Sequence, residues 1–569
     1  MEVLRFLCPP EFATPEMLRA VHLSTLDGTI LPVTAKFSES ILHVSFSTID
    51  SFRLHVPWDV PSYGHQLLMT GMLARRSEPY YLSVELARGL CASVRNQATD
   101  WEVLGLNIPE TFWEMIYKAG RLLLQAISLA RETTFPRPEV DMIAQQSLSE
   151  CLAATQILSH CYVERVLYLR KLAWQSQEKK ALPTASQTEP PENEDLDEEQ
   201  MVALLQQMEN TPFLEDLPEE EHFSTNDTAL HIADALPPKY VGTRLDWTPL
   251  EKVVKPLFFE TFNQINIDLS WAKIDQNPET LSEFEKQMAW ANSNGFPVTT
   301  GPVINFFPQH VPQRLQAFRG DFAAITQAVR QYTEFIVKRF RSRVNTWIAT
   351  ARSNTYFPLG LTALQQLELT ALIIRWIREF QPTAEIITSI DQPWGEGVLN
   401  APIGASGGNV EVLPPMTCAE ILLRSHLPLS GLQLEFNIGY LHRSSYDRPA
   451  VCWSRLMDQW SSLNVPLYLT FRVPSASTPD PQATIPTHPI WKEWSSRQQA
   501  VWASQILPLL LAKPYVYGIE WAVFRDYRPH DYPHAGLISV DGKIKRTQKI
   551  LAEIQKFFSL EETGVPKMV

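Results

Sequence analysis

The chain has 569 residues, 45% of them hydrophobic and 20% charged, which is the composition of an ordinary globular protein too long for one hydrophobic core. Its formal net charge of −14 is concentrated in residues 181–236, which contain 15 Asp or Glu and no Lys or Arg. The rest of the sequence is close to neutral, which argues against a nucleic-acid-binding surface.

The six cysteines are scattered, without a CxxC pair or a Cys/His ligand spacing, so we expect neither a metal site nor a cofactor. The first residues lack the basic segment and long apolar run of a signal peptide. The sequence also contains no run of 18 apolar residues. These patterns predict a cytoplasmic protein that does not enter a membrane.

Residues 1–75 are predicted to form a β-rich module. The segments ILHVSFSTI (41–49) and FRLHVPW (52–58) alternate apolar and polar residues as strands do, and Asp27-Gly28 is a turn signal. We expect a small antiparallel sheet or half-sandwich. Such a module could bind sugars or pack on a neighbouring domain, and the sequence leaves both readings open.

Residues 76–175 are predicted to form a helical hairpin or bundle. Apolar residues recur there at intervals of three to four, Pro109 stands where a helix could begin, and Pro136 and Pro138 separate two further segments. The bundle could mediate self-association or serve as a plain core.

Residues 176–236 are predicted to form an acidic flexible linker. A polar, acidic and proline-containing segment cannot bury enough apolar area to offset the entropy of ordering. Within it, DEEQMVALLQQME (197–209) begins with acids and carries an apolar stripe, which predicts a short helix. This helix could dock on the protein's own surface or on a partner.

Residues 237–562 alternate strand-like and helix-like segments, followed by a tail at 563–569. This alternation predicts parallel strands joined by right-handed crossovers, and eight such strands would close a (β/α)8 barrel. An open doubly wound sheet is the alternative, but no Gly-rich phosphate loop follows a strand. The expected strands lie within 239–247, 262–269, 297–307, 344–350, 384–391, 431–439, 465–471 and 515–524.

In their order, these segments resemble the strands of the xylanase-type barrel of glycoside hydrolase family 10. In that family, strand 4 reads roughly W-D-V-V-N-E and ends in the catalytic acid, whereas strand 7 reads roughly T-E-L-D and carries the nucleophile. The matching segments here are Trp347–Arg352 and Thr470–Val473. Trp521 and HAGLISVDGKIKR (534–546) resemble the last strand and the closing segment of the family.

The resemblance places unsuitable residues at both catalytic positions. Retaining hydrolysis needs two carboxyl groups about 5–5.5 Å apart, one protonated and one nucleophilic. The acid position is Arg352, which does not release a proton at physiological pH, and the nucleophile position is Phe471. We therefore expect the family reaction to be lost. The family's Glu, Asn, Lys, His and Trp at sugar-binding positions are also replaced, by Asn266, Ile267, Ser270, Pro302 and Phe306.

Other carboxylates near the predicted strand ends could form a relocated catalytic pair: Asp391, Glu396, Glu435 and Glu520. In the loop after strand 5, Asp391 and Glu396 flank Trp394 as in a sugar site, although either acid could instead pair with Arg352 or another arginine. Glu435 could likewise pair with Arg352 or Arg472.

The resemblance and the strand-end positions together predict a set of ligand-binding residues: Trp271, Gln309, His310, Arg352, Asn354, Asp391, Trp394, Glu396, Asn437, Trp521 and Asp526. The segment 525–536 contains two Asp and two His, but their spacing matches no metal-binding motif. It predicts a hydrogen-bonded lid over the barrel mouth.

Three functions remain open from the sequence. The first is a xylanase-like barrel that has lost the reaction and acts in carbohydrate binding or scaffolding. The second is an active glycoside hydrolase with relocated carboxylates. The third is an assembly protein with a passenger barrel. The expected partners are a glycan or oligosaccharide and a second copy of the chain, bound through the helical region, and neither nucleic acid nor membrane is expected.

Overall fold

The computed structural model describes residues 2–12, 14–26, 28–47, 51–131, 137–181, 239–246, 250–397, 412–440, 445–485, 487–490 and 494–558. The acidic segment beyond residue 181 and its predicted helix at 197–209 lie outside the described residues, as does the tail. By their contacts, Met1–Val163 and Pro238–Val569 form one compact unit, and Glu164–Pro237 form another. The division into an N-terminal module, a helical region, a linker and a barrel stays a proposal.

The N-terminal region is β-rich, as predicted. It forms two four-stranded sheets, ordered β4-β5-β1-β8 and β3-β2-β6-β7, and in β5 every second residue is buried, as the alternating sequence requires. The elements are β1 (Glu2–Leu7), η1 (Pro10–Phe12), α1 (Pro15–Ala20), β2 (His22–Ser24), β3 (Ile30–Leu31), β4 (Thr34–Ser38), β5 (Ile41–Phe46), β6 (Arg53–Val60), β7 (Gly64–Met69) and β8 (Tyr80–Tyr81).

Three helices follow, so the predicted helical region is confirmed: α2 (Leu82–Val103), α3 (Glu110–Arg131) and α4 (Pro138–Ala181). Helix α3 begins directly after Pro109. It buries Phe112, Ile116, Ala119 and Leu123, which are spaced three to four residues apart and therefore share one face. In the part of the chain that the structure describes, no helix combines the length and apolar character needed to cross a membrane.

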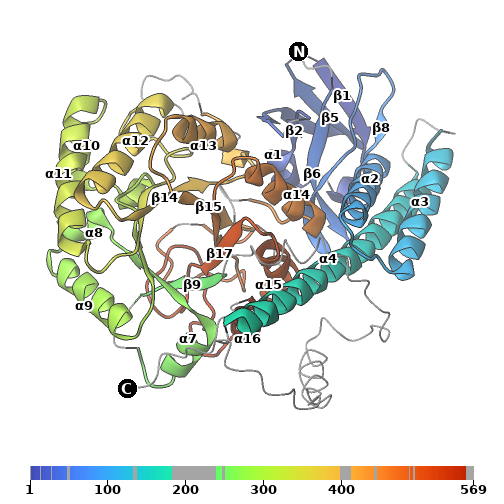
Figure 1. Ribbon diagram of the computed structural model, residues 1–569. Helices are drawn as coiled ribbons and strands as arrows, with labels where there is room; N and C mark the ends of the chain where they lie inside the picture. The colour runs from blue at the N-terminus through green and yellow to red at the C-terminus, as the bar shows by residue number, and fades with distance from the viewer. Residues whose placement is uncertain are drawn as a thin grey trace, which may run out of the picture. The chain divides into compact units, whose positions relative to one another are not determined.

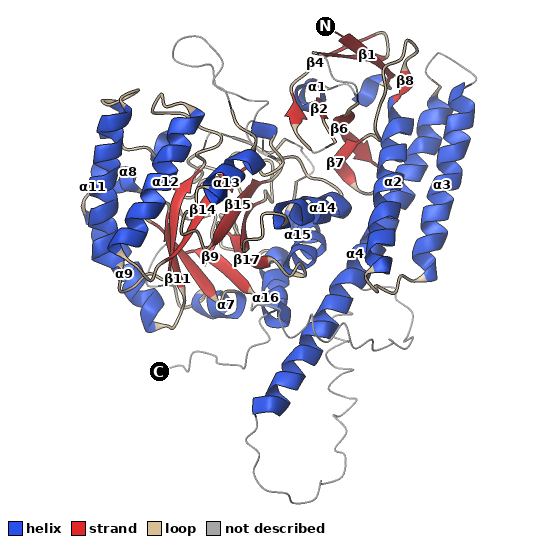
Figure 2. Ribbon diagram, turned by 45° about the horizontal axis from the view of Figure 1, so that its top comes forward, coloured by secondary structure: helices blue, strands red, loops and turns tan. Residues whose placement is uncertain are grey.

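The C-terminal half is a closed parallel barrel, which confirms the predicted (β/α)8 fold and excludes the open sheet. Strand β17 pairs with β9, and β11 pairs with β13, so the ring has no free edge. The barrel strands are drawn in red in Figure 2, with helices around them. The strands are β9 (Tyr240–Arg244), β10 (Gln264–Asp268), β11 (Val298–Gly301), β12 (Ile304–Asn305), β13 (Thr346–Ala351), β14 (Glu385–Asp391), β15 (Gly431–Asn437), β16 (Leu467–Arg472) and β17 (Val516–Trp521).

Helices cover the outside of this ring (Figure 1). Side-chain caps fix where several of them begin: Asp321 caps α11, and Thr362 forms a capping box with Gln365 at the start of α12. The helices are α7 (Lys255–Thr261), α8 (Trp271–Gln276), α9 (Glu279–Ser293), η2 (Pro308–His310), α10 (Gln313–Gln316), α11 (Phe322–Phe340), α12 (Ala363–Phe380), α13 (Pro415–Arg424), α14 (Ala450–Ser461), α15 (Ser496–Leu511) and α16 (Arg546–Phe558).

The N-terminal region and the barrel share a hydrophobic core. Val451 of α14 and Leu509 of α15 belong to the cluster whose other buried members come from residues 4–158. Polar contacts join the same two regions: the Leu67 N–H of β7 donates to the carbonyl of Asp447 at 2.7 Å, and Arg455 donates to Ser93 Oγ at 2.6 Å.

Candidate functional site at the mouth of the barrel

The carboxyl ends of the barrel strands bring most of the predicted site residues together. Because side chains alternate along a strand, β15 turns Phe436 outward and Glu435 and Asn437 toward the barrel axis. The strand register sets Glu435 beside Asp391 of β14 and Asn437 beside Arg472 of β16. Polar residues at these inward positions therefore meet at one end of the barrel, where active sites of this fold lie.

Glu435 stands at the centre of this arrangement, between two arginines. Arg352 Nε donates to both of its carboxylate oxygens, at 3.0 and 3.2 Å, and Arg352 Nη2 also donates to Oε1. Arg472 Nη1 donates to the same Oε1 at 2.8 Å. All three side chains are at most 4% exposed. Arg352 has a positive φ of 61°, so the backbone adopts an unfavourable conformation to place this guanidinium.

Further arginines and carboxylates pair in turn across the mouth. Asp531 accepts from Arg472 and from Arg244, each at 3.2 Å. Arg244 also pairs with Glu520 at 3.2 Å, and Asn266 donates to the other oxygen of Glu520 at 2.7 Å. We call Arg244, Arg352, Glu435, Arg472, Glu520 and Asp531 the mouth cluster. Its three cations and three anions compensate one another, as buried charges must.

The two neighbouring acids of the mouth have opposite protonation tendencies. Burial would raise the pKa of Glu435, but Arg352 and Arg472 outweigh it and lower this pKa to about 2. Burial raises the pKa of Asp391 to about 7, and the nearby charge of Glu435 adds to the effect. Glu435 is therefore ionised at neutral pH, whereas Asp391 is largely protonated below pH 7.

Among the described residues, no arginine is hydrogen-bonded to the Asp391 carboxyl group. Thr355 Oγ1 donates to Oδ2 at 2.9 Å, and Asn437 Nδ2 lies 3.4 Å from Oδ1. Asn354 binds the Asp391 backbone instead: its side-chain oxygen accepts from the Asp391 N–H at 3.0 Å, and its amide donates to the carbonyl at 2.8 Å. Asn354 thus fixes the end of β14 in place and has no contact with the carboxyl group.

Glu396 and Trp394, expected beside Asp391, belong to a separate cluster. Glu396 pairs with Arg448 at 2.7 Å, and both side chains are at most 4% exposed. The Arg448 guanidinium lies 4.1 Å from the centre of the Trp394 ring, whose edge packs on Trp453 of α14. Trp394 is therefore a packed side chain and does not form an open platform for a sugar ring.

Trp271 and Trp521 are also engaged within the protein. Trp521 is 1% exposed and donates its indole N–H to the carbonyl of Ala535 at 2.8 Å. Trp271 stacks on Tyr332 of α11 with ring centres 4.0 Å apart. Both rings are parts of the packing in this structure.

Of the two predicted residues in η2, His310 reaches the mouth, with Nε2 3.8 Å from Asp531 Oδ1, whereas Gln309 is exposed. Burial lowers the pKa of this imidazole, so it is neutral at physiological pH.

The expected position of Phe471 requires a correction. Phe471 lies on the outer face of β16, stacked on Phe436 and packed against Trp502 of α15. The inward residue at this height is Arg472. Because neighbouring residues of a strand face opposite sides, Phe471 does not point into the mouth, and the inward Arg472 beside it is already paired with Glu435.

The segment 525–536 closes the mouth. Tyr532 is 2% exposed and lies over the guanidinium groups of Arg352 and Arg472, 5.8 and 5.4 Å from its ring centre. Tyr440 holds the segment by donating to the carbonyl of Pro533 at 2.9 Å. The segment is therefore a packed cover and not an open loop.

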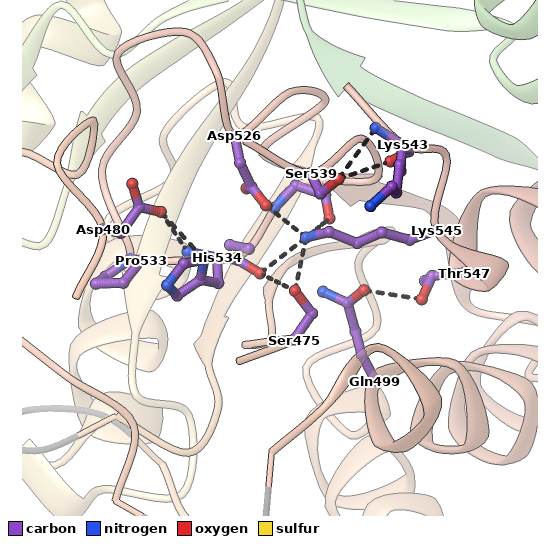
Figure 3. A network of polar contacts seen from close by, with 12 residues as sticks. Ser475, Asp480, Gln499, Asp526, Pro533, His534, Ser539, Lys543, Lys545 and Thr547 are labelled. Carbon is purple, nitrogen blue, oxygen red and sulfur yellow. Dashed lines mark hydrogen bonds and ion pairs between the residues drawn. The ribbon is translucent and has the colours of Figure 1, made fainter. Parts of the chain in front are cut away.

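A buried lysine anchors the base of this cover (Figure 3). Lys545 Nζ donates to Asp526 Oδ2 at 2.5 Å, to Ser475 Oγ at 2.6 Å and to the carbonyl of Gly536 at 2.7 Å. Asp480, Asp526 and His530 bring three potential ligand atoms within 4.8 Å of one another. Since Lys545 already supplies a positive charge to Asp526, the cluster is explained by ion pairing.

Asp526, one of the predicted ligand-binding residues, is thus 0% exposed and accepts from the backbone N–H of Gly536 as well as from Lys545. Its role in this structure is to connect the covering segment with the chain that enters α16.

Sequence reasoning missed several residues of this region. Arg244 and Arg448 lie 287 and 52 residues from their partners Asp531 and Glu396, so sequence spacing gives no sign of either pair. Tyr532 shows no signal apart from its place in a polar loop. A charged residue at an inward strand end was the available clue for Arg244, because such a charge needs a buried partner.

No family model matches the chain, and no curated protein is recognisably similar to it in sequence. Among solved structures, the fold is similar to xylanase 10B from Thermotoga maritima, with 17% identity and a TM-score of 0.41 over 57% of this chain and 97% of that one. It is also similar to xylanase 10B from Thermotoga petrophila RKU-1 in complex with xylobiose, with 16% identity and a TM-score of 0.41 over 60% of this chain and 99% of that one.

A GH10 endoxylanase from a sugarcane soil metagenome gives the same TM-score at 14% identity, covering 56% of this chain and 97% of that one. The barrel itself is established by its strand pairings.

Proposed function

We propose that this barrel binds carbohydrate without hydrolysing it. The proposal is supported by the resemblance of the strand segments to a xylanase-type barrel and by one observation of the mouth. Glu435, the most central candidate acid, receives hydrogen bonds on Oε1 from three arginine nitrogen atoms. An oxygen engaged in this way has little freedom to attack an anomeric carbon, and the neighbouring candidate Glu520 is paired with Arg244.

The alternative is a hydrolase with relocated carboxylates, and one observation favours it. The pKa of Asp391 is raised to about 7, whereas that of Glu435 is lowered to about 2. Two acids with separated pKa values are the usual signature of an acid and nucleophile pair. Against this reading, Tyr532 covers the same groups and Asp391 is only 1% exposed, so a substrate could reach them only after the covering segment moved.

The scaffolding reading has a surface of its own. Tyr117 and Leu124, seven residues apart on α3, are 61% and 68% exposed. A second copy of the chain could cover them. If it does, replacing both with Glu should convert a dimer into a monomer in analytical ultracentrifugation.

The test of the main proposal combines turnover and binding on the full chain. We expect no release of reducing sugar from xylan and no aglycone from aryl xylosides or glucosides, together with binding to saccharides on a glycan array. Detectable turnover that Glu435→Gln or Asp391→Asn abolishes would establish the relocated-carboxylate enzyme and overturn the proposal.

A second experiment places carboxylates at the two positions that resemble the catalytic pair of the family. It tests whether only these two residues are missing or whether the surrounding site is also unsuitable. The double variant Arg352→Glu with Phe471→Glu should recover no activity, because it adds a carboxylate beside Glu435 and buries another in the aromatic layer outside the barrel. Arg472→Glu is the matched variant that faces inward. Activity of the double variant above that of the unchanged protein would show that Phe471 does reach the mouth.

A further inference from the structure

A hollow lies outside the mouth cluster, where the N-terminal region meets the barrel. Its volume is about 310 Å³, within the range of small-molecule sites and sufficient for roughly one or two sugar rings. We call it the interface cavity. The residues that line it include two tryptophans, a tyrosine and several glutamines: Tyr63, Gln66, Gln156, Trp494, Trp502 and Gln505.

Four separate segments of the chain build this cavity, one of them being residues 447–450 before and at the start of α14. One wall is the β6–β7 hairpin, which supplies Tyr63 and Gln66, and another is α4, which supplies Gln156. The barrel contributes α15, on which Gln498, Trp502 and Gln505 share one face at intervals of three to four residues. The exposed side chains of Ser62 and Gln498 show that the cavity reaches the surface.

The cavity has a rigid aromatic floor. Trp502 donates its indole N–H to Asp447 Oδ1 at 3.0 Å, and its ring packs against Trp453 and Phe471 with ring centres 5.7 and 5.5 Å apart. The Asp447 carboxylate is fixed in turn by the backbone N–H of Arg448 at 2.8 Å. The floor is therefore already in position before a ligand enters, which lowers the entropic cost of binding.

The walls offer hydrogen-bonding groups that the protein itself leaves unused. Among the described residues, the side-chain amides of Gln156, Gln498 and Gln505 have no hydrogen-bond partner. Each amide presents two N–H donors and one carbonyl acceptor. Such a group can pair with a hydroxyl in either direction, which suits a ligand rich in hydroxyl groups.

The charges around the cavity select against an ionic ligand. Arg448 is paired with Glu396 at 2.7 Å and covered by Trp394, so its charge is compensated. Burial raises the pKa of the Asp447 carboxyl to about 6, so this acid is mostly ionised at pH 7. Among the described residues that line the cavity, the basic side chains are His65, which lies 3.9 Å from Asp59, and Arg448, which is already bound to Glu396. A phosphate or carboxylate ligand would meet repulsion from Asp447, whereas a neutral ligand would not.

We propose that the interface cavity binds a small neutral saccharide, with a sugar face against the half-buried indole of Trp494 and its hydroxyls on the glutamine amides and Asp447. This proposal rests on the carbohydrate-binding half of the proposed function and is independent of whether the mouth hydrolyses anything. It places the ligand outside the barrel axis, in a site that requires the N-terminal region.

The experiment titrates the full chain with xylobiose, cellobiose and maltose by calorimetry, with glucuronic acid as the charged probe. We expect at least one neutral disaccharide to bind and glucuronic acid to bind more weakly. Gln156→Leu and Gln505→Leu should each weaken the affinity by up to about tenfold, the usual effect of one lost hydrogen bond. Gln313→Leu, an exposed glutamine of α10, is the matched control and should change nothing.

The outcomes separate this inference from the proposed function. If a disaccharide binds but both cavity variants bind it as tightly as the unchanged protein, the ligand sits elsewhere. The cavity proposal then fails while the proposed function stands. If glucuronic acid binds as tightly as the neutral sugars, the charge argument is wrong and the proposal also falls. If no disaccharide binds and the glycan array is empty, both proposals are overturned.

Discussion

The mouth of the barrel and the interface cavity are both lined by polar side chains, but they differ in how those side chains are satisfied. In the mouth cluster, each arginine has a carboxylate partner, and Tyr532 covers the assembly. In the cavity, three glutamine amides lack partners among the described residues, and the space beside them is open. The charges of the first region are compensated by ion pairs within it, although Arg352 Nη1 and Arg472 Nε have no hydrogen-bond partner among the described residues. The second region leaves three whole amide groups of its described residues unpaired.

This difference shows why a site cannot be located from residue types alone. The mouth holds the residues that a glycosidase would use, namely acids, an imidazole and aromatic rings, yet these groups bind one another. A buried network of paired charges rigidifies the structure and resists a ligand, because the ligand must first break these ion pairs. Unpaired groups beside a preformed hollow impose no such cost.

The largest effect that would test the comparison is expected from Arg472→Leu. This change leaves Glu435 and Asp531 with one arginine fewer each in a buried setting, so we expect a loss of about 3–5 kcal/mol in the free energy of unfolding. Chemical denaturation measures it. Arg341→Leu, an exposed arginine after α11, is the control and should change stability by less than about 0.5 kcal/mol. Equal effects of the two variants would contradict a structural role for the mouth cluster.

The pH dependence of stability should sharpen the comparison at Asp391. Its pKa is raised from 3.8 to about 7 in the folded protein, so between these values the folded state holds a proton that the unfolded state has released. The stability contributed by this carboxyl is therefore present at low pH and is lost as pH rises through the window from about 4 to about 7.

Asp391→Asn removes this ionisation. The unfolding free energy of the variant relative to the unchanged protein should therefore increase between pH 5 and pH 8, as measured by urea denaturation at both values. Glu435 interacts with Asp391, but its pKa of about 2 keeps it ionised in both proteins over this range. Acids far from Asp391 titrate alike in both proteins and cancel in the difference. A difference that does not vary with pH would mean that Asp391 is not protonated in the folded state.

The smallest effect is expected from Gln505→Leu in the cavity. Because the Gln505 amide has no hydrogen-bond partner among the described residues, its removal should change the free energy of unfolding by no more than about 0.5 kcal/mol. Thermal and chemical denaturation on the full chain would check this value. A loss comparable to that of Arg472→Leu would show that the amide supports the fold and is not held ready for a ligand.

The sequence allowed the whole barrel to be predicted but only part of the mouth. All eight strand segments lie where the apolar runs placed them, because buried parallel strands must be apolar over several residues. Which single residues point into the barrel was harder to predict from the sequence. Phe471 and Arg472 are neighbours, and an error of one residue in the strand register exchanges the inward and outward side chains.

Contacts between distant segments were harder still to foresee. Arg244 with Asp531, and Gln66 with Gln505 across one cavity, are brought together only by the folded chain. For the acidic segment beyond residue 181, flexibility stays a prediction.

Helix α15 takes part in two packed interiors at once. Phe471 of the barrel wall lies against Trp502, while Leu509 of the same helix belongs to the N-terminal core. Close-packed interiors transmit small displacements because they contain little free volume to absorb them. A ligand that displaced α15 from the cavity side would therefore also displace strand β16, through the contact of Trp502 with Phe471. Strand β16 carries Arg472. Through α15, binding in the interface cavity would therefore be coupled to the position of Arg472 in the mouth cluster.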